Sequence, residues 1–376
     1  MLPNSPTTDQ FSYLRPENDS KSFESVYQLR KIFESSEVSN QLLAFIDYYF
    51  GYKIPSSAPT LQLFKQKLKP KSIYKCPNKL TKPKIDRLKT AISHTNFMYS
   101  EQSTFYFMNI LSNGHELKIL KLTTVPEFKT EFISSQTVEA DEKSTIYSGY
   151  QNNFIYFNRH FLQLNKFTNS TKGEINILPV DVKLLECGLD NFLFTSGDYS
   201  VHLASIHCKN KSQIYLSKEK IIKMVSNPPF KVFSVATANQ HVSIISLNTE
   251  NLVNTVNVKA HIVNMIYTQQ WSFLVVFTTE SIVVLNVDGD VVKSINGFNE
   301  FVGNCQTFSS LTGFDYIVYQ NEKNDIILFE AFYPDKRRVL FTATSKMNAM
   351  VYDYTTSSLI FIFSNGKVQM QPISLD

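Results

Sequence analysis

The chain has 376 residues, of which 43% are hydrophobic and 19% are charged, so it can bury a sizeable core and is not disordered overall. Its 11 glycines form neither a G-x-G pair nor a G-x-S-x-G turn, which excludes a dinucleotide-binding turn and a nucleophile elbow. The net charge is only +4, but nine Lys and one Arg against one Asp fall between Lys65 and Lys89.

The cysteines and the hydropathy pattern indicate a cytoplasmic protein. The four cysteines lie far apart and form no C-x-x-C pair, which is typical of free thiols in a reducing compartment. The first ten residues, MLPNSPTTDQ, are polar, so we expect no signal peptide. The longest apolar runs have five residues, whereas a membrane-spanning helix needs about 18 or more.

The N-terminal region predicts a short helical part. Residues 1–20 are polar and are expected to be disordered. Between Phe23 and Phe50 the apolar residues follow one another at steps of three and four, which predicts two short amphipathic helices within 21–70. Gly51 is a plausible end to the second helix, and Pro55 and Pro59 stop it from continuing.

Residues 93–376 have the character of a β-repeat protein. One unit, a polar turn followed by an apolar run, recurs seven times at steps of 44, 40, 41, 40, 44 and 42 residues, starting at Leu117, Phe161, Val201, Val242, Ile282, Ile326 and Val368. A period of about 40 to 45 residues with four short strands per unit is the signature of a β-propeller blade. The unit SIVVLNV is apolar at both alternating positions, as expected of a strand between two neighbouring blades. The sequence therefore predicts an all-β, seven-bladed propeller.

The last unit is too short to form a complete blade. Eight residues follow Val368, which leaves no room for an outermost strand. Because an open strand edge promotes aggregation, we expect another segment to supply this strand. We assign residues 71–92 as a basic linker that also provides the closing strand.

Two segments of the repeats resemble divergent WD repeats. TSGDYSVHLASI, from Thr195 to Ile206, is similar to the S-G-S-x-D-x-T-V-x-L-W phrase, with Asp198 at the turn aspartate and Ala204 in place of Trp. KAHIVNMI, from Lys259 to Ile266, is similar to the G-H-x-x-x-V opening of a blade, with His261 in place. None of the seven units keeps a Trp-Asp pair, so the fold expected is a WD-like propeller.

The N-terminal helical part resembles the end of a BEACH domain. FESSEVSNQLLAFIDYYFGYK, from Phe33 to Lys53, is similar to the last conserved stretch of that family, and PTLQLFKQKLKP, from Pro59 to Pro70, is similar to its terminal segment. The matching residues that we assign to structural roles are Glu34, Ser35, Val38, Ser39, Ile46, Asp47, Phe50, Gly51, Tyr52 and Lys53. Residues 21–70 would thus be a helical remnant of the domain, with most of it missing, as in a natural truncation or a degenerate paralogue.

This resemblance, to the neurobeachin and beige-like families, implies a non-catalytic scaffold for protein partners. It further implies a role in vesicle or endolysosomal membrane trafficking or in autophagy, in the cytoplasm or peripherally on endomembranes. The alternative function is that of a β-propeller enzyme. A ring of carboxylates or histidines around the central channel would favour this alternative. We assign no catalytic residue or cofactor, because the sequence has no local catalytic signature. We assign no metal site, because His202, His207 and Cys208 do not share one strand face.

The basic stretch is a second candidate surface. Each basic residue near an anionic membrane contributes about 1 kcal/mol of attraction, so several together would recruit the protein to a membrane. The candidate contacts are Lys65, Lys67, Lys69, Lys71 and Lys75. A solvated linker is the simpler interpretation. Nucleic acid is disfavoured, because aromatic side chains are not interleaved with the charges as stacking platforms.

Overall fold

The computed structural model describes residues 81–111, 116–137, 145–148, 153–157, 161–166, 176–179, 182–187, 191–205, 211–300, 302–310 and 313–375. The chain divides into two compact units, Met1–Cys76 and Pro77–Asp376. All described residues belong to the second unit. The expected disordered segment 1–20 and the expected helical remnant 21–70 therefore lie outside the described residues.

The described strands of the second unit form seven four-stranded antiparallel sheets. We number the sheets 1 to 7 in chain order. Sheets 1 to 3 consist of β2 (Ile92–Glu101), β3 (Thr104–Leu111), β4 (Glu116–Thr123) and β5 (Lys129–Thr137); β6 (Thr145–Ser148), β7 (Asn153–Phe157), β8 (Phe161–Lys166) and β9 (Asn176–Pro179); and β10 (Val182–Cys187), β11 (Asn191–Ser196), β12 (Ser200–Ser205) and β13 (Lys211–Leu216).

Sheets 4 to 7 repeat the same up-and-down order. They consist of β14 (Ile221–Asn227), β15 (Val232–Thr237), β16 (His241–Ser246) and β17 (Leu252–Asn257); β18 (Ile262–Tyr267), β19 (Leu274–Thr278), β20 (Ser281–Leu285) and β21 (Val291–Asn296); β22 (Cys305–Ser309), β23 (Asp315–Gln320), β24 (Asp325–Glu330) and β25 (Arg338–Thr342); and β26 (Met347–Asp353), β27 (Ser358–Phe363), β28 (Lys367–Pro372) and β1 (Lys84–Arg87). Among the described residues the one helix is a 3₁₀ turn at Pro228–Phe230. The prediction of an all-β fold for 93–376 is confirmed.

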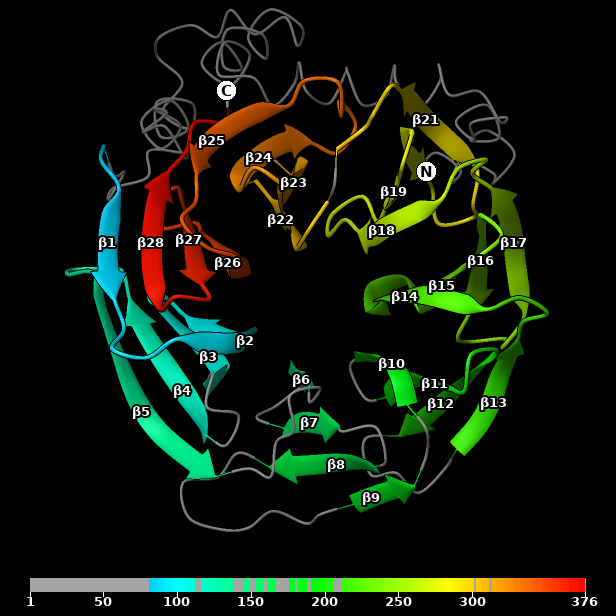
Figure 1. Ribbon diagram of the computed structural model, residues 1–376, viewed down its shortest axis with the longest axis horizontal. Coiled ribbons are helices and arrows are strands. Elements are labelled where there is room, and N and C mark those ends of the chain that lie inside the picture. The colour runs from blue at the N-terminus through cyan, green and yellow to red at the C-terminus, as the bar shows by residue number, and fades with distance from the viewer. Residues whose placement is uncertain are drawn as a thin grey trace, which may run out of the picture. The chain divides into compact units, whose positions relative to one another are not determined.

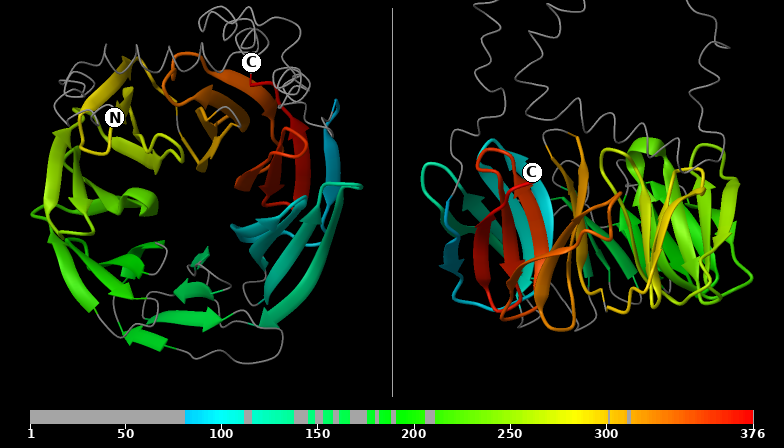
Figure 2. Two further views of the ribbon diagram at one scale, coloured as in Figure 1. Left: turned by 180° about the vertical axis from the view of Figure 1, so that it is seen from behind. Right: turned by 90° about the horizontal axis from the view of Figure 1, so that it is seen from above.

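The seven sheets follow one another around a common centre. The first strand of each sheet contacts the first strand of the next, in the order β2, β6, β10, β14, β18, β22 and β26, and β26 contacts β2 again. Figure 1 shows these first strands facing the middle and the fourth strands on the outside, and Figure 2 gives the same arrangement from behind and from the side. The first strands thus face a common centre.

The seven repeat units occupy the same place in every sheet. Their starting residues fall at the beginning of β4, β8, β12, β16, β20, β24 and β28, which are the third strands. All five residues of β20 are buried, as are the four central residues of β24. A third strand has a neighbouring strand on each edge and a neighbouring sheet on each face, so both of its faces are apolar.

The outer strands show the opposite pattern. In β17 and β21 exposed residues alternate with better buried ones, and the same holds for β1. Water therefore reaches one face of each outer strand. Several exposed apolar side chains remain there, including Ile85 (59% exposed), Leu252 (54%) and Val291 (49%).

A segment from before sheet 1 completes sheet 7. Strand β1 pairs antiparallel with β28, with Lys84 opposite Met370 and Arg87 opposite Lys367. The amide of Leu88 then donates a 2.9 Å hydrogen bond to the carbonyl of Gly366. The fourth strand of this sheet is thus supplied by residues within the range 71–92, far from the other three strands in sequence.

Candidate functional site

Most sequence-predicted contact residues cannot be placed. Lys65, Lys67, Lys69, Lys71 and Lys75 lie outside the described residues. So do the ten residues between Glu34 and Lys53 that match the BEACH motif. Two WD-motif residues and the end of the basic stretch lie within the described part of the chain.

The described end of the basic stretch lies at the outer edge of sheet 7. Lys82, Arg87 and Lys89 are exposed, and Lys84 is half-buried within β1. Ile85 is 59% exposed between two of these basic residues. This edge thus presents basic and apolar groups to solvent.

Asp198 and His261 lie at strand entrances in different sheets, and the structure does not bring them into one site. Asp198 follows Gly197, whose φ is +69°, in the turn from β11 to β12, and its carbonyl accepts a 2.7 Å hydrogen bond from Ile221 N. His261 is exposed immediately before β18, and its carbonyl accepts a 2.9 Å hydrogen bond from Thr279 N. The backbone carbonyls of Asp198 and His261 each connect two strand ends.

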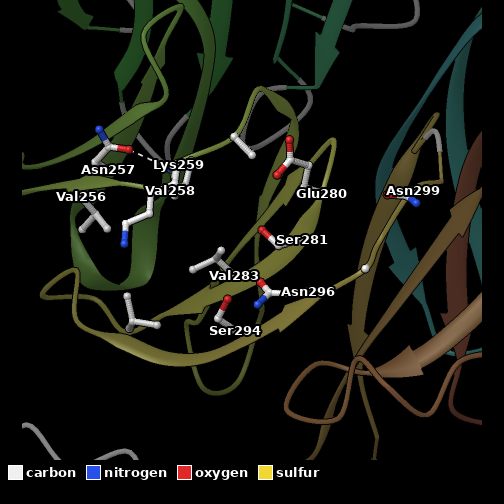
Figure 3. A pocket seen from close by; sticks show the side chains of 13 residues that line it. Val256, Asn257, Val258, Lys259, Glu280, Ser281, Val283, Ser294, Asn296 and Asn299 are labelled. Atoms are coloured by element: carbon white, nitrogen blue, oxygen red, sulfur yellow. Dashed lines mark hydrogen bonds between the residues drawn. The ribbon is translucent and has the colours of Figure 1, made fainter.

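A groove of about 530 Å³ lies between the outer part of sheet 4 and the face of sheet 5 (Figure 3). The end of β17 and the following residues 258–260 form one side, and strands β20 and β21 with residues 297–299 form the other. Its lining combines apolar side chains with amide, hydroxyl and charged ones: Val256, Val258, Ala260, Val283 and Val291, then Asn257, Asn296, Asn299, Ser281 and Ser294, then Lys259 and Glu280.

The register of β20 and β21 explains the floor of the groove. Ser281 pairs with Asn296, and Val283 pairs with Ser294. Residues two apart on a strand point to the same side, so these four side chains share one face of sheet 5. A mixed polar and apolar floor results from four positions on two separate strands.

Backbone turns shape the rim. The side chain of Asn257 accepts a 2.8 Å hydrogen bond from the amide of Lys259, which adopts a left-handed φ of 60° (Figure 3). On the opposite side the amides of Gly297 and Phe298 both donate to the carbonyl of Glu280, at 2.9 and 3.0 Å. Lys259 and Glu280 are both exposed, so the groove carries one charge of each sign at its rim.

The groove has the chemistry of a binding surface. The described side chains that form it include no histidine, cysteine or aspartate. Its three asparagines supply amide donors and acceptors, and its valines supply apolar contacts. The sequence carries no local motif for this site, because its residues come from three strands and three connecting segments.

Neither a metal-binding cluster nor a membrane-spanning helix is found in the described part of the chain. No group of three or more His, Cys, Asp or Glu side chains is placed to hold a metal ion there. Within the same residues, no helix has the length and apolar character that a transmembrane segment requires.

Comparison with known proteins gives the fold. No family model and no curated protein matches the chain. Two similar solved structures are crystal structures of BBS1N in complex with ARL6DN, one soaked with mercury and one soaked with lead. The mercury-soaked structure has 9% sequence identity to this chain and a TM-score of 0.59, and the match covers 78% of this chain and 96% of that one. The lead-soaked structure has 10% identity and a TM-score of 0.57, and the match covers 78% of this chain and 97% of that one. The likeness supports a β-propeller fold, in agreement with the ring of four-stranded sheets.

Proposed function

We propose that the protein is a non-catalytic scaffold for protein partners, built on a seven-bladed, WD-like propeller. The observation that carries this proposal is the groove between sheets 4 and 5, which combines peptide-sized space, amide side chains and opposite charges. Two similar structures contain a second protein, ARL6DN, which is consistent with a propeller that displays surfaces for partners.

The occupant that best fits the groove is an extended polypeptide segment. The side-chain amides of Asn296 and Asn299 provide both donors and acceptors, as backbone amides and carbonyls require. Lys259 and Glu280 on opposite sides would fix the direction of a segment that carries charges of both signs.

The enzyme alternative has less support. The sequences of the described first strands contain three carboxylate residues, Glu101, Glu186 and Asp353, and one histidine, His94. The carboxylate of Asp353 accepts hydrogen bonds from the hydroxyls of Thr355 and Thr356 in its own turn. This is not the ring of carboxylates and histidines that we expected of a propeller enzyme.

The trafficking role follows from the BEACH-like motifs and belongs to the same proposal. On that basis the protein acts in vesicle or endolysosomal trafficking or autophagy, in the cytoplasm or peripherally on endomembranes. The supporting residues are the motif positions between Glu34 and Lys53.

A membrane-lipid binder is the second candidate. It is favoured by the exposed Lys82, Arg87 and Lys89 beside the exposed Ile85. Flotation with anionic liposomes would compare wild type with a variant that neutralises Lys65, Lys67, Lys69 and Lys71. Weaker flotation of the variant supports this candidate, and equally poor flotation of both proteins rejects it.

The scaffold proposal is tested with a charge swap in the groove. Lys259→Glu with Glu280→Lys keeps the net charge and reverses both rim charges. The matched control is Lys218→Glu with Glu322→Lys, two exposed positions outside the groove. Proximity labelling in cells should lose a set of partners with the groove variant and keep it with the control. Identical partner sets for both variants would reject the groove as the docking surface.

A further inference from the structure

A second cavity, of about 310 Å³, lies at the first strands of sheets 3 to 6. Glu186 comes from β10, Lys223 from β14, Ile266 from β18 and Cys305 from β22. The volume equals the share of about ten water molecules and reaches the lower end of the range for small-molecule sites. It is separate from the groove.

Two residues of opposite charge line this cavity, Glu186 and Lys223, and both are half-buried. The Lys223 ammonium favours the charged forms of both the Glu186 carboxyl and the Cys305 thiol, which lowers the pKa of each against the larger effect of burial. In the described part of the chain, however, Glu186 and Lys223 form no direct ion pair.

The Glu186 carboxyl is poorly compensated as it stands. Removal from water raises its pKa to about 7, although Lys223 and the side chain and amide of Ser226 favour its charged form. Its hydrogen bond from Ser226 Oγ is long, at 3.5 Å. A carboxylate whose pKa is raised in this way would gain from a cation placed beside it.

Three other polar side chains of the wall, Asn264, Asn304 and Tyr267, already have hydrogen-bond partners. The side-chain amide of Asn264 donates to the carbonyl of Gly303 at 3.0 Å, and its oxygen accepts from the amide of Met265 at 2.9 Å. Asn304 donates to the carbonyl of Met347, and the Tyr267 hydroxyl lies 2.7 Å from Ser234 Oγ. Recognition of a ligand would therefore depend on the two charged residues.

We propose that this cavity binds a small zwitterion, of which a free α-amino acid with an apolar side chain is the simplest. Its ammonium would face Glu186 and its carboxylate would face Lys223. Its side chain would contact Val225, Met265 and Ile266. A ligand with a single charge would leave either Glu186 or Lys223 unpaired in a site of restricted solvent, which is unfavourable.

The test uses three probes, L-leucine, L-methionine and L-phenylalanine, at about 10 mM with the full chain at pH 8, where Glu186 is mostly ionised. Thermal unfolding and titration calorimetry measure binding. At least one probe should raise Tm and give a binding isotherm. The N-acetylated form, which is only an anion, and the methyl ester, which is only a cation, should bind at least tenfold more weakly.

Substitutions of the two charged residues complete the experiment. Glu186→Gln and Lys223→Met should each weaken binding at least tenfold, whereas Lys220→Met, an exposed lysine just before β14, should not change it. Cooperative melting of each variant shows that it is folded. The proposal is overturned if no probe raises Tm, if the acetylated form binds as tightly as the free amino acid, or if either charge can be removed without loss. None of these results would bear on the groove.

Discussion

The backbone amide of Trp271 donates a 2.8 Å hydrogen bond to the buried carboxylate of Asp315. Trp271 lies in the β18–β19 turn of sheet 5, whereas Asp315 begins β23 of sheet 6. The same carboxylate accepts from the amide of Gln270 at 2.9 Å and from Ser309 Oγ at 2.6 Å. One acidic side chain therefore joins two neighbouring sheets and satisfies three donors.

Replacing Asp315 with alanine should strongly destabilise the protein. Each buried donor left without a partner costs about 1–3 kcal/mol, so we expect a loss of about 3 kcal/mol or more in the free energy of unfolding. Urea unfolding measures the change. Asp288→Ala, at an exposed aspartate in a hairpin turn, is the control and should change it by less than about 0.5 kcal/mol. Equal effects would show that the Asp315 bridge contributes nothing.

A charge inside β20 should abolish folding. Val284 has 0% exposure, and an unpaired carboxylate there costs several kcal/mol against a total stability of about 5–15 kcal/mol. Val284→Asp should therefore lose the cooperative melting transition measured by circular dichroism. Val291→Asp, on the adjacent strand at 49% exposure, should melt close to wild type. Native melting of Val284→Asp would mean that β20 is not interior.

The contact between the segment after β1 and the turn between β27 and β28 can be tested with a glycine-to-alanine substitution, which adds one methyl group. A Cβ on Gly366 would lie 2.6 Å from the carbonyl oxygen of Thr90, and Gly366 has a φ of +80°. Gly297 has a φ of +81° with nothing within 4 Å of the added atom, so it isolates the conformational cost of about 1 kcal/mol. Gly366→Ala should lower Tm clearly more than Gly297→Ala. Equal shifts would mean that the segment after β1 moves without cost.

Stability should fall as the pH rises through the titration of Glu186. Its pKa is raised from 4.5 to about 7 in the folded protein, so between these values the folded state binds more protons than the unfolded state. The free energy of unfolding should then decrease from about pH 5 to pH 8, by at most about 3 kcal/mol from this group.

Glu186→Gln is the comparison that isolates this effect. Urea unfolding of wild type and variant at pH 5 and pH 8 separates Glu186 from the histidines, which titrate in both proteins. The variant should show the smaller decrease and should be the more stable protein at pH 8. The same decrease in both proteins would contradict a raised pKa at Glu186.

The repeat could be predicted from the sequence, because the third strand of each sheet is buried on both faces and therefore forms an apolar run. The seven starting residues from Leu117 to Val368 fall at the same place in seven sheets, and the period of 40 to 44 residues is the length of one sheet with its turns. The need for an added strand was also visible, and β1 pairs with β28 within the range 71–92. The WD-like and BEACH-like motifs remain predictions.

The two candidate sites left no local signal. Glu186 and Lys223 are 37 positions apart, and Cys305 is a further 82 positions along the chain. Asp315 reaches the 270–271 turn, across a sheet boundary. These residues come together because neighbouring sheets pack side by side around a common centre. No short stretch of sequence specifies that packing.

The all-β character and the repeated unit follow from the amino-acid order, since alternation and burial of apolar residues are local properties of each strand. Packing between sheets sets which side chains share the second cavity, which line the groove, and which carboxylates lose contact with water. Those outcomes depend on the angle and distance between neighbouring sheets, and these are fixed by packing across the whole ring.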